Sequence, residues 1–407
     1  MATDISVIRT HFLRLIGRHV KIRSLELPGF YVKLKSYPDI RIPDPAKIMD
    51  WLTPHLSNES SQKLMSWIEE RGSITNRWIV LELPGNEGSS TYCLNLRSGS
   101  LQPNRGPRFG LRSSYRTASK SGQGSPKLVQ SSTVDILDRS TILSRDLHGI
   151  AQGLDSSHVI LVGVGSLGGA VAAQLARAGV GRITLIDPEI LVSENIGRHV
   201  LGADDLGKPK AYALRNRILK DLPTAKVEAY ATYAEAVLHQ KKDLFEKANL
   251  VIVTTADWES EVALWRVKSQ GAIWGLLHAW SEPYTQVGHA LFAPSGSPDA
   301  RYLFEDNGNF LHKYTEWPEG GVVPLPACGE SFIPGGSLGM TNVASMVSQS
   351  ALRVLSRELS TATWITTIYR PQDVAGLGGR YLGPPLPDGV QQSILERRWP
   401  DQMESVA

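Results

Sequence analysis

The pattern of apolar and polar positions divides the 407-residue chain into parts of different character. Residues 1–96 alternate helical periodicity with short strand-like runs, which predicts a small α+β domain. Helices are expected over 6–17, 48–56 and 61–71, and strands over 31–34, 78–83 and 92–96. Residues 97–134 are rich in Ser, Gly and Arg and lack apolar periodicity, so we expect a linker there.

From residue 135 onward strands and helices alternate, which predicts an α/β fold with a doubly wound, mostly parallel, Rossmann-like sheet. Strands are expected over 159–162, 183–186, 227–231, 250–254, 273–277, 286–292 and 365–369. Helices are expected near 136, after Gly169, and over 210–219, 233–245, 259–268 and 338–358. This domain is placed at 135–373, and the Pro- and Gly-rich tail 374–407 is expected to be irregular.

Composition and charge exclude several classes of protein. A net charge of +3 gives no overall field that favours nucleic acid or a membrane surface. The longest apolar run begins at Val159 and contains a glycine turn, so it does not predict a membrane span, and the N-terminus lacks the pattern of a secretory signal. Two cysteines are too few for a disulfide framework or a four-thiolate zinc site, which favours the reducing cytoplasm. The only local charge excess is the linker, with seven Lys/Arg and no Asp or Glu, interpreted as a solvated segment or, alternatively, a dock for an acidic partner.

A glycine-rich turn follows the first strand of the larger domain. Gly163, Gly165 and Gly168 allow a tight turn and close backbone approach, and the Ala-rich helix after them would place its N-terminus against phosphate oxygens. The next strand ends at Asp187, which is placed to accept hydrogen bonds from a ribose. This combination predicts nucleotide binding, although the glycine pattern alone is shared by many Rossmann-type folds.

The residues after Asp187 separate a triphosphate site from a dinucleotide site. Asn195, Arg198 and Lys210 follow it closely, and the two cations could neutralise charge that develops on a triphosphate. A dehydrogenase does not need cations at these positions. The sequence therefore favours ATP over NAD.

These motifs resemble the adenylating enzymes of the ThiF/MoeB type, which include ubiquitin-activating enzymes. The family pattern S-N-[LI]-x-R is similar to residues 193–198, with Glu194 as one extra residue, and G-[KQ]-P-K is similar to residues 207–210. Glu189 and His199 stand where relatives often have Asp and Gln. The resemblance covers about half of the chain and implies an adenylation domain that uses ATP and Mg²⁺.

The resemblance also implies roles for individual residues. Asp187 would bind the ribose, Asn195, Arg198 and Lys210 the phosphates, and Asp257, after the fourth strand, the magnesium ion. Arg145 lies where relatives carry an arginine that reaches the nucleotide of a neighbouring subunit, which implies a homodimer. An arginine on a helix surface, paired with Asp146 or solvated, is an equally weighted interpretation.

Cys328 is the candidate nucleophile. It lies in the Pro- and Gly-rich stretch 324–336, which suits a thiolate that must meet a bulky partner, and it resembles the Cys-Gly of bacterial activating enzymes. A small buried side chain is the competing interpretation. Cys93 alternates with apolar neighbours in a strand-like run and is predicted to be core. His278 is interpreted as a hydrogen-bonded histidine near a strand end or, alternatively, as part of the channel for the carrier's tail. Trp274, Trp280 and Trp317 are predicted to be packing residues rather than platforms for base stacking.

The resemblance implies activation of a ubiquitin-like protein with a free C-terminal tail. ATP adenylates the carboxylate, Cys328 takes the acyl group as a thioester, and a conjugating enzyme receives it; bacterial enzymes of this sort resemble parts of antiphage operons. The N-terminal domain would then be a docking or scaffold module. Three alternatives stay open: sulfur-carrier adenylation without a thioester, an NAD-dependent oxidoreductase, and a non-catalytic scaffold. The first is disfavoured because this sequence has no paired C-x-x-C zinc ligands, which those relatives usually carry.

Overall fold

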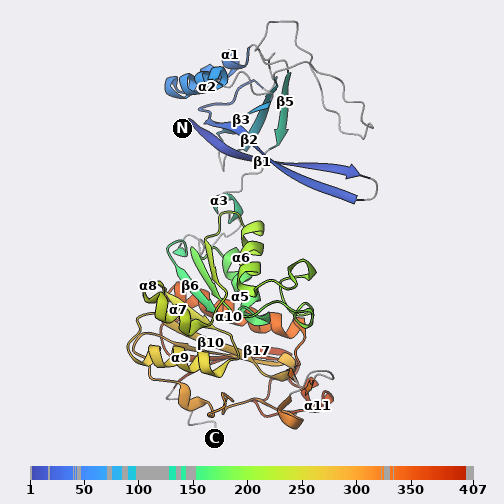
Figure 1. The fold of residues 1–407 in the computed structure, drawn as a ribbon, viewed down its shortest axis with the longest axis vertical. Coiled ribbons are helices and arrows are strands. Elements are labelled where there is room, and N and C mark those ends of the chain that lie inside the picture. The colour runs from blue at the N-terminus through green and yellow to red at the C-terminus, as the bar shows by residue number, and fades with distance from the viewer. Residues whose placement is uncertain are drawn as a thin grey trace. The chain divides into compact units, whose positions relative to one another are not determined.

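The chain forms two compact units, Met1–Ile136 and Leu137–Ala407, in a computed structural model (Figure 1). The structure describes residues 2–16, 19–39, 41, 43, 47–70, 76–84, 90–97, 128–133, 139–143, 153–321, 323–324, 331–332 and 334–399.

The first unit is a five-stranded sheet in the order β1-β2-β3-β4-β5. The strands are β1 Ala2–Ile16, β2 His19–Lys33, β3 Asn76–Leu83, β4 Ser90–Arg97 and β5 Leu128–Thr133. Strands β2 and β3 are parallel and are joined through α1 Ile48–Leu52, η2 Thr53–His55 and α2 Asn58–Glu70. Its core includes the fully buried Val32, Leu52, Leu64, Ile79 and Leu96.

Two predictions for this unit are wrong. The helix expected over 6–17 is strand β1, which pairs antiparallel with β2 along almost its whole length. The segment is rich in β-branched residues, and a cross-strand partner decides between helix and strand where an apolar run is short. The linker expected over 97–134 contains β5, which pairs with β4 from Tyr92–Thr133 to Arg97–Leu128. The polar sequence LVQSST gave no apolar alternation, because β5 is an edge strand of the sheet.

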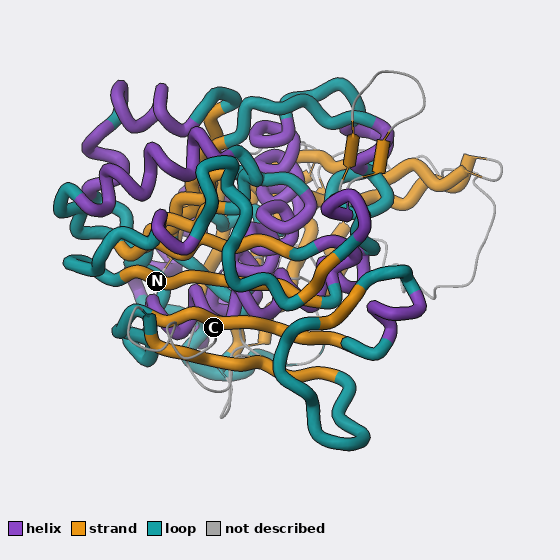
Figure 2. Tube along the Cα trace, turned by 90° about the horizontal axis from the view of Figure 1, so that it is seen from below, coloured by secondary structure: helices purple, strands orange, loops and turns teal. Residues whose placement is uncertain are grey.

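The second unit is an eight-stranded sheet in the order β17-β15-β11-β10-β9-β6-β7-β8. The strands are β6 His158–Val162, β7 Arg182–Ile186, β8 Val227–Tyr230, β9 Leu250–Val253, β10 Gly275–Ser281, β11 Val287–Ala293, β15 Thr363–Tyr369 and β17 Gln392–Arg398. From β8 to β10 the strands are parallel, and β11, β15 and β17 continue the sheet antiparallel. Figure 2 shows strands running side by side with helices packed next to them.

Helices cover both faces of this sheet. One core contains buried residues of α5 Ser166–Arg177, α6 Lys210–Asp221 and α10 Ser337–Leu355. The other contains buried residues of α7 Ala234–Gln240, α8 Lys242–Glu246 and α9 Trp258–Ser269. The predicted α/β fold with a doubly wound, mostly parallel sheet is therefore confirmed. A short helix, α3 Arg139–Ile142, precedes this sheet.

The C-terminal tail differs from its prediction. Residues 374–407 were expected to be irregular, yet β16 Arg380–Tyr381 pairs with β12 Thr315–Glu316, and β17 forms the edge of the large sheet. One partly buried position of β17 is Arg397, whose guanidinium lies 5.2 Å from the centre of the Trp364 ring. Because a cation packs on aromatic rings at this partly buried position, the alternation of buried and exposed residues in β17 does not appear as an alternation of apolar and polar residues in the sequence. Strand β10 also begins two residues later and ends four residues later than the predicted 273–277.

Candidate functional site: a nucleotide cradle at the switch point of the sheet

The order of the parallel strands reverses between β6 and β9. From β6 the chain continues to β7 and β8 on one side, whereas β9 leads to β10 on the other. In open α/β sheets, ligands bind outside the carboxyl ends of the strands at such a switch point. The predicted glycine turn follows β6 directly, so the structure places it at this position.

The three glycines of the turn have different structural reasons. Gly163 has φ +82°, and a Cβ there would lie 2.8 Å from the backbone of Thr254 at the end of β9. A Cβ on Gly168 would lie 2.0 Å from the carbonyl oxygen of Gly163. In contrast, a Cβ on Gly165 would meet no atom within 4 Å. Packing explains Gly163 and Gly168, whereas Gly165 borders open space where a ligand could approach the backbone.

Asp187 is buried and holds the glycine turn in place. Its Oδ2 accepts a hydrogen bond from the Val164 N–H at 2.7 Å, and its Oδ1 accepts one from the Glu189 N–H at 2.8 Å. Burial raises the pKa of this carboxyl, while both N–H groups and the charge of Lys210 act in the opposite direction. Because each carboxylate oxygen has a second lone pair, Asp187 can also accept from a ribose hydroxyl.

His199 supports the turn from the other side, a role that the sequence did not predict. Its Nε2 lies 2.8 Å from the Val164 carbonyl oxygen, and its Nδ1 lies 3.0 Å from the Leu201 N–H. A carbonyl only accepts and an amide only donates, so the neutral ring carries its proton on Nε2. Burial lowers the pKa of His199, and the charges of Lys210 and Arg198 act in the same direction. His199 thus fixes the shape of the turn through two hydrogen bonds.

Two cations lie beside this turn. Lys210 is buried at the start of α6, and its ammonium contacts the carboxylate of Glu189. Arg198 is partly exposed, and among the residues that the structure describes its guanidinium makes no hydrogen bond or ion pair. Asn195 ends the short η3 helix Ser193–Asn195, where its Oδ1 accepts from the Val192 N–H. The predicted phosphate ligands therefore all lie in the segment that connects β7 to α6, residues 187–210, which we call the crossover segment.

Asp257 lies exposed in the loop after β9, at the same edge of the sheet. Its Oδ2 accepts a hydrogen bond from the Ser260 hydroxyl at 2.7 Å. No group of three or more His, Cys, Asp or Glu that could hold a metal occurs in the described part of the chain. Mg²⁺ needs only one or two carboxylates when phosphates and water complete its coordination, so this single carboxylate fits an ion that arrives with a triphosphate.

Other predicted residues fall into two groups. Arg145 and Cys328 lie outside the described residues. Cys93 is buried, and desolvation raises the pKa of its thiol to about 12, in agreement with a core position. His278 is also buried and fully paired, between the Trp265 indole N–H at 3.2 Å and Glu261 at 3.1 Å. Of the tryptophans, Trp274 and Trp317 are buried and Trp280 packs within an aromatic cluster.

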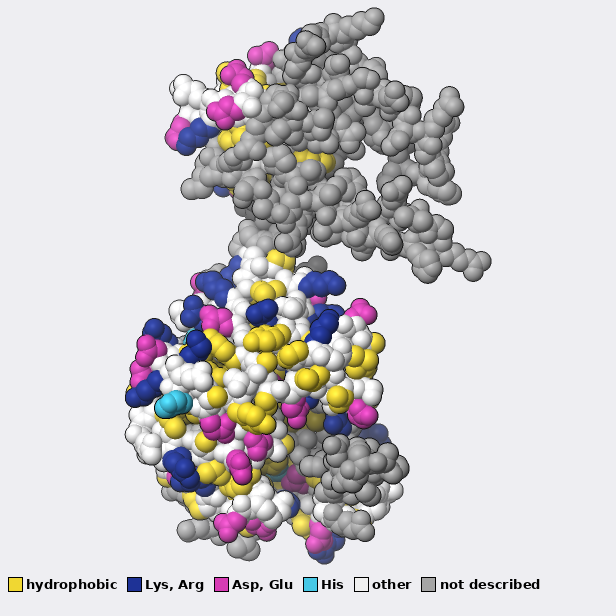
Figure 3. Space-filling model, viewed as in Figure 1, with side chains coloured by type: hydrophobic (Ala, Val, Ile, Leu, Met, Phe, Trp, Pro, Cys, Tyr) yellow, Lys and Arg dark blue, Asp and Glu magenta, His cyan; other side chains and the backbone are white. Residues whose placement is uncertain are grey.

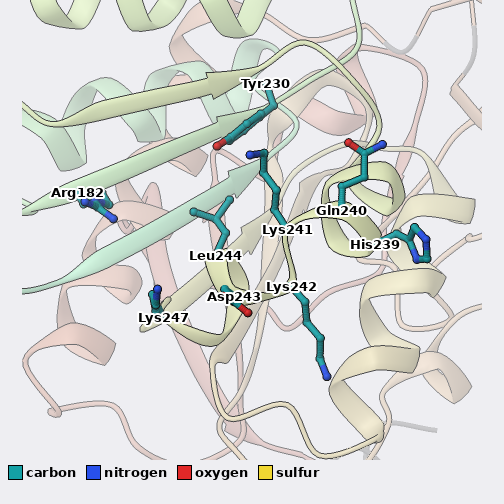
Figure 4. Close-up of a pocket in the computed structure, with 9 residues that line it drawn as sticks. All are labelled: Arg182, Tyr230, His239, Gln240, Lys241, Lys242, Asp243, Leu244 and Lys247. Atoms are coloured by element: carbon teal, nitrogen blue, oxygen red, sulfur yellow. The ribbon is translucent and has the colours of Figure 1, made fainter.

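A basic pocket of about 490 Å³ lies beside β7 and β8 (Figure 4). It is formed by the start of β7, the end of β8 and the residues around α7 and α8. The lining residues are Arg182, Tyr230, His239, Gln240, Lys241, Lys242, Asp243, Leu244 and Lys247. None of the site residues predicted from the sequence lines this pocket.

The switch-point turn, the acid after β7 and the neighbouring cations define a nucleotide-binding α/β domain. The ThiF family matches residues 139–370, more than half of the chain, and the protein belongs to this family.

Several proteins are similar to parts of the chain. The probable adenylyltransferase/sulfurtransferase MoeZ of Mycobacterium tuberculosis is 27% identical over 50% of this chain and 48% of its own. The ATP-dependent ubiquitin transferase-like protein Cap2 of Pseudomonas aeruginosa is 24% identical over 60% of this chain and 42% of its own. An uncharacterised protein of Sinorhizobium fredii, y4oA, is 26% identical over 52% and 38%. The chain thus spans less than half the length of these relatives.

Among solved structures, Escherichia coli MccB is similar with a TM-score of 0.42 and 17% identity, over 65% of this chain and 72% of that one. No helix in the described ranges combines the length and apolarity needed to cross a bilayer.

Proposed function

We propose that the protein uses ATP to adenylate the C-terminal carboxylate of a ubiquitin-like protein, forms a thioester with it on Cys328, and passes it to a conjugating enzyme. The observation that carries the adenylation step is the pair of cations at the glycine turn. Lys210 contacts Glu189, whose N–H donates to Asp187. Arg198 directly precedes His199, which is hydrogen-bonded to the turn. Two positive charges beside a phosphate-binding turn exceed what a dinucleotide requires and suit a triphosphate.

Each residue of the cradle has a role in this proposal. The N-terminus of α5 and the open face of Gly165 bind phosphate oxygens, and Asp187 accepts from the ribose. Asn195, Arg198 and Lys210 bind the phosphates, so that negative charge on the α-phosphate is stabilised when the carboxylate attacks it. Asp257 would hold Mg²⁺, which, when bound, neutralises charge on the leaving pyrophosphate. The carboxylate oxygen forms a bond to phosphorus, the bond to pyrophosphate breaks, and an acyl adenylate remains.

The acyl adenylate is a mixed anhydride that a thiolate can open. The sulfur of Cys328 would attack the acyl carbon, AMP would leave, and the acyl group would remain as a thioester. Cys328 falls within residues 325–330, which join the paired strands β13 Val323–Pro324 and β14 Ser331–Phe332. This connection lies in the chain between β11 and α10, within the matched family region.

A homodimer is part of the proposal, with Arg145 reaching the nucleotide of the partner subunit. Large apolar side chains are exposed along the crossover segment and at the start of α6 beside the cradle, and a second copy of the chain would cover them. They are Ile190, Val192, Val200, Leu206 and Tyr212. In Figure 3, apolar side chains gather on the second unit around the position of α6.

The remaining parts of the chain receive supporting roles. The first unit, Met1–Ile136, would serve as a docking or scaffold module for the carrier or the conjugating enzyme, and the second unit, Leu137–Ala407, as the adenylation domain. The second candidate function is sulfur-carrier adenylation without a thioester, which the similarity to MoeZ favours. The chain has two cysteines and no paired C-x-x-C, so it lacks the zinc ligands that those relatives usually have.

The test is an adduct assay with ATP, Mg²⁺ and ubiquitin-fold proteins that end in Gly-Gly. We expect an adduct that thiols cleave, that Cys328→Ala abolishes and that Cys93→Ala retains, because Cys93 is buried with a strongly raised pKa. Adenylate without an adduct would support the sulfur-carrier function instead. An adduct that survives Cys328→Ala would contradict the assignment of the nucleophile.

A further inference from the structure

A second buried acid–histidine pair joins Glu282, which directly follows β10, to His289 in β11. Glu282 and His289 are both buried, and Glu282 Oε1 lies 2.7 Å from His289 Nε2. The Trp364 indole N–H donates to His289 Nδ1 at 3.1 Å, so the ring proton is on Nε2 and is donated to Glu282. Burial alone raises the pKa of Glu282, but the hydrogen bonds from His289, Thr315 and Tyr314 outweigh it and hold that pKa below its usual value.

Glu282 also binds the segment that precedes Cys328. Its Oε1 accepts from the Tyr314 N–H at 2.7 Å, and its Oε2 accepts from the Thr315 hydroxyl at 2.5 Å. The Trp317 indole N–H then donates to the Thr315 hydroxyl at 2.7 Å. One buried carboxylate therefore fixes residues 314–317, only a few positions before the strand β13.

The turn after Glu282 is strained and closely packed. It forms η5 Pro283–Thr285, where Tyr284 has φ +64° and Thr285 has φ +60°. Non-glycine residues in the left-handed region are strained, and two in a row persist only when the surrounding contacts hold them. The Tyr284 ring lies 4.3 Å from the Trp317 ring, which is one of these holding contacts.

The residues on either side of the Cys328 segment, which we define as residues 322–333, contact this turn. On the incoming side, a Cβ on Gly321 would lie 2.7 Å from the Pro283 ring. On the outgoing side, the Tyr284 N–H donates to the Pro334 carbonyl at 2.6 Å. A Cβ on Gly339, at the start of α10, would lie 1.9 Å from the Thr285 hydroxyl oxygen. The chain leaves the turn near residue 321 and returns to it at residue 334.

This turn and the nucleotide cradle share one edge of the sheet. Strands β6, β9 and β10 are parallel neighbours, with Val162 aligned to Val253 and Val253 aligned to His278. Neighbouring strands are about 4.8 Å apart and a residue advances about 3.3 Å, so Glu282 lies on the order of 15 Å from the glycine turn. The residues that flank the Cys328 segment are thus near the glycine turn, but they are held by contacts with residues 283–285 and not by contacts with the glycine turn.

We infer that Glu282 and His289 are positioning residues for the thioester step, because they clamp the turn from which the Cys328 segment leaves and to which it returns. This inference rests on the proposed function. The pair contacts neither the glycine turn nor the residues assigned to phosphate, so the adenylation step does not depend on it. Its loss should separate the two steps.

A matched pair elsewhere in the same fold provides the comparison. Glu261 and His278 form a buried pair at 3.1 Å, and Glu261 Oε1 accepts from the Thr255 hydroxyl at 2.9 Å. Thr255 follows β9 in the loop that carries Asp257, and its hydroxyl oxygen accepts from the Asp257 N–H at 3.2 Å. This pair supports the nucleotide edge of the site, so Glu261→Gln should lower adenylation itself.

The experiment measures adenylate and thioester in the same single-turnover reaction of the full chain. The probe is the Gly-Gly-ended ubiquitin-fold protein that supports pyrophosphate exchange by the wild type. We expect Glu282→Gln to lower the ratio of thioester to adenylate at least tenfold while pyrophosphate exchange changes less than twofold. Glu261→Gln should lower both products together and leave their ratio unchanged. Thr315→Val, which removes only one hydrogen bond to Glu282, should lower the ratio in the same direction and to a smaller extent.

Hydrogen exchange gives a readout that does not depend on the carrier. Glu282→Gln should accelerate amide exchange in 314–321 and 334–340 and leave 163–169 unchanged. If wild type forms the thioester and both Glu282→Gln and Thr315→Val keep its ratio to adenylate, the positioning role is wrong and the proposed function stands. If wild type forms adenylate and never a thioester, both the thioester function and this inference fail.

Discussion

Replacement of Lys210 by methionine tests whether the buried cation of the cradle binds phosphate. Lys210 is 5% exposed and begins α6 beside the glycine turn. Methionine keeps the length and the apolar stem of the side chain and removes the ammonium. Asp187 keeps both of its backbone hydrogen bonds in this variant, so the turn should retain its shape.

The structure sets the size of the two expected effects. Glu189, the present partner of Lys210, is 66% exposed on its side chain, so loss of their contact should cost about 1 kcal/mol or less of folding free energy. A hydrogen bond from an ammonium to a phosphate contributes about 1.5–3 kcal/mol, which corresponds to about a 10- to 150-fold rise in Kd. The variant should therefore fold and bind ATP weakly.

Titration calorimetry with MgATP measures this directly, with Lys220→Met as the matched control. Lys220 is exposed near the other end of the same helix, about 15 Å away at 1.5 Å per residue. At that distance its charge is screened at physiological ionic strength. We expect less than a twofold change in Kd for Lys220→Met. Equal MgATP affinity for wild type and Lys210→Met would show that this lysine serves only Asp187 and Glu189, and would refute the phosphate role.

Further predictions concern the turn, the buried acid and the buried thiol. Gly168→Ala should lower the free energy of unfolding by several kcal/mol, because its Cβ would lie 2.0 Å from the Gly163 carbonyl oxygen. Gly165→Ala should be as stable as wild type but bind MgATP at least tenfold more weakly. Normal MgATP binding by Gly165→Ala would contradict the proposed ligand position. Because the folded-state pKa of Glu282 lies below its ordinary 4.5, its stabilisation is complete above that pH and is lost as the pH falls toward the folded value. The stability difference between wild type and Glu282→Gln, from denaturant titrations, should therefore shrink between pH 5 and pH 3, and a constant difference would count against the ionised carboxylate. Cys93 should resist iodoacetamide at pH 8 in the folded protein and react after unfolding, as read by mass spectrometry; rapid labelling when folded would disprove its burial.

The sequence predicted where the glycine turn and Asp187 lie in the fold, because the signals for both are local. Gly163 and Gly168 are required by contacts within one turn and its neighbouring strand, and Asp187 ends a strand that the apolar run already marks. Parallel strands that are buried on both faces appear in a sequence as continuous apolar runs. The parallel strands of the second unit were therefore predicted with errors only at the ends of the strands.

The roles of His199 and Glu282 could not be predicted in the same way. His199 acts through a contact with Val164, and Glu282 binds Thr315, 33 positions further along the chain. No periodicity reports such long-range pairing. Strand β1 was missed for a similar reason, because its identity depends on pairing with β2. Strand β17 was not predicted because a cation, Arg397, packs against aromatic rings where a strand pattern would have an apolar residue.

Pyrophosphate exchange into ATP tests the central claim most directly. We expect labelled pyrophosphate to enter ATP only when Mg²⁺ and a ubiquitin-fold protein ending in Gly-Gly are both present, and Lys210→Met to slow this exchange at least tenfold. No exchange with any such protein, together with tighter binding of NAD than of MgATP, would contradict adenylation and identify the cradle as a dinucleotide site.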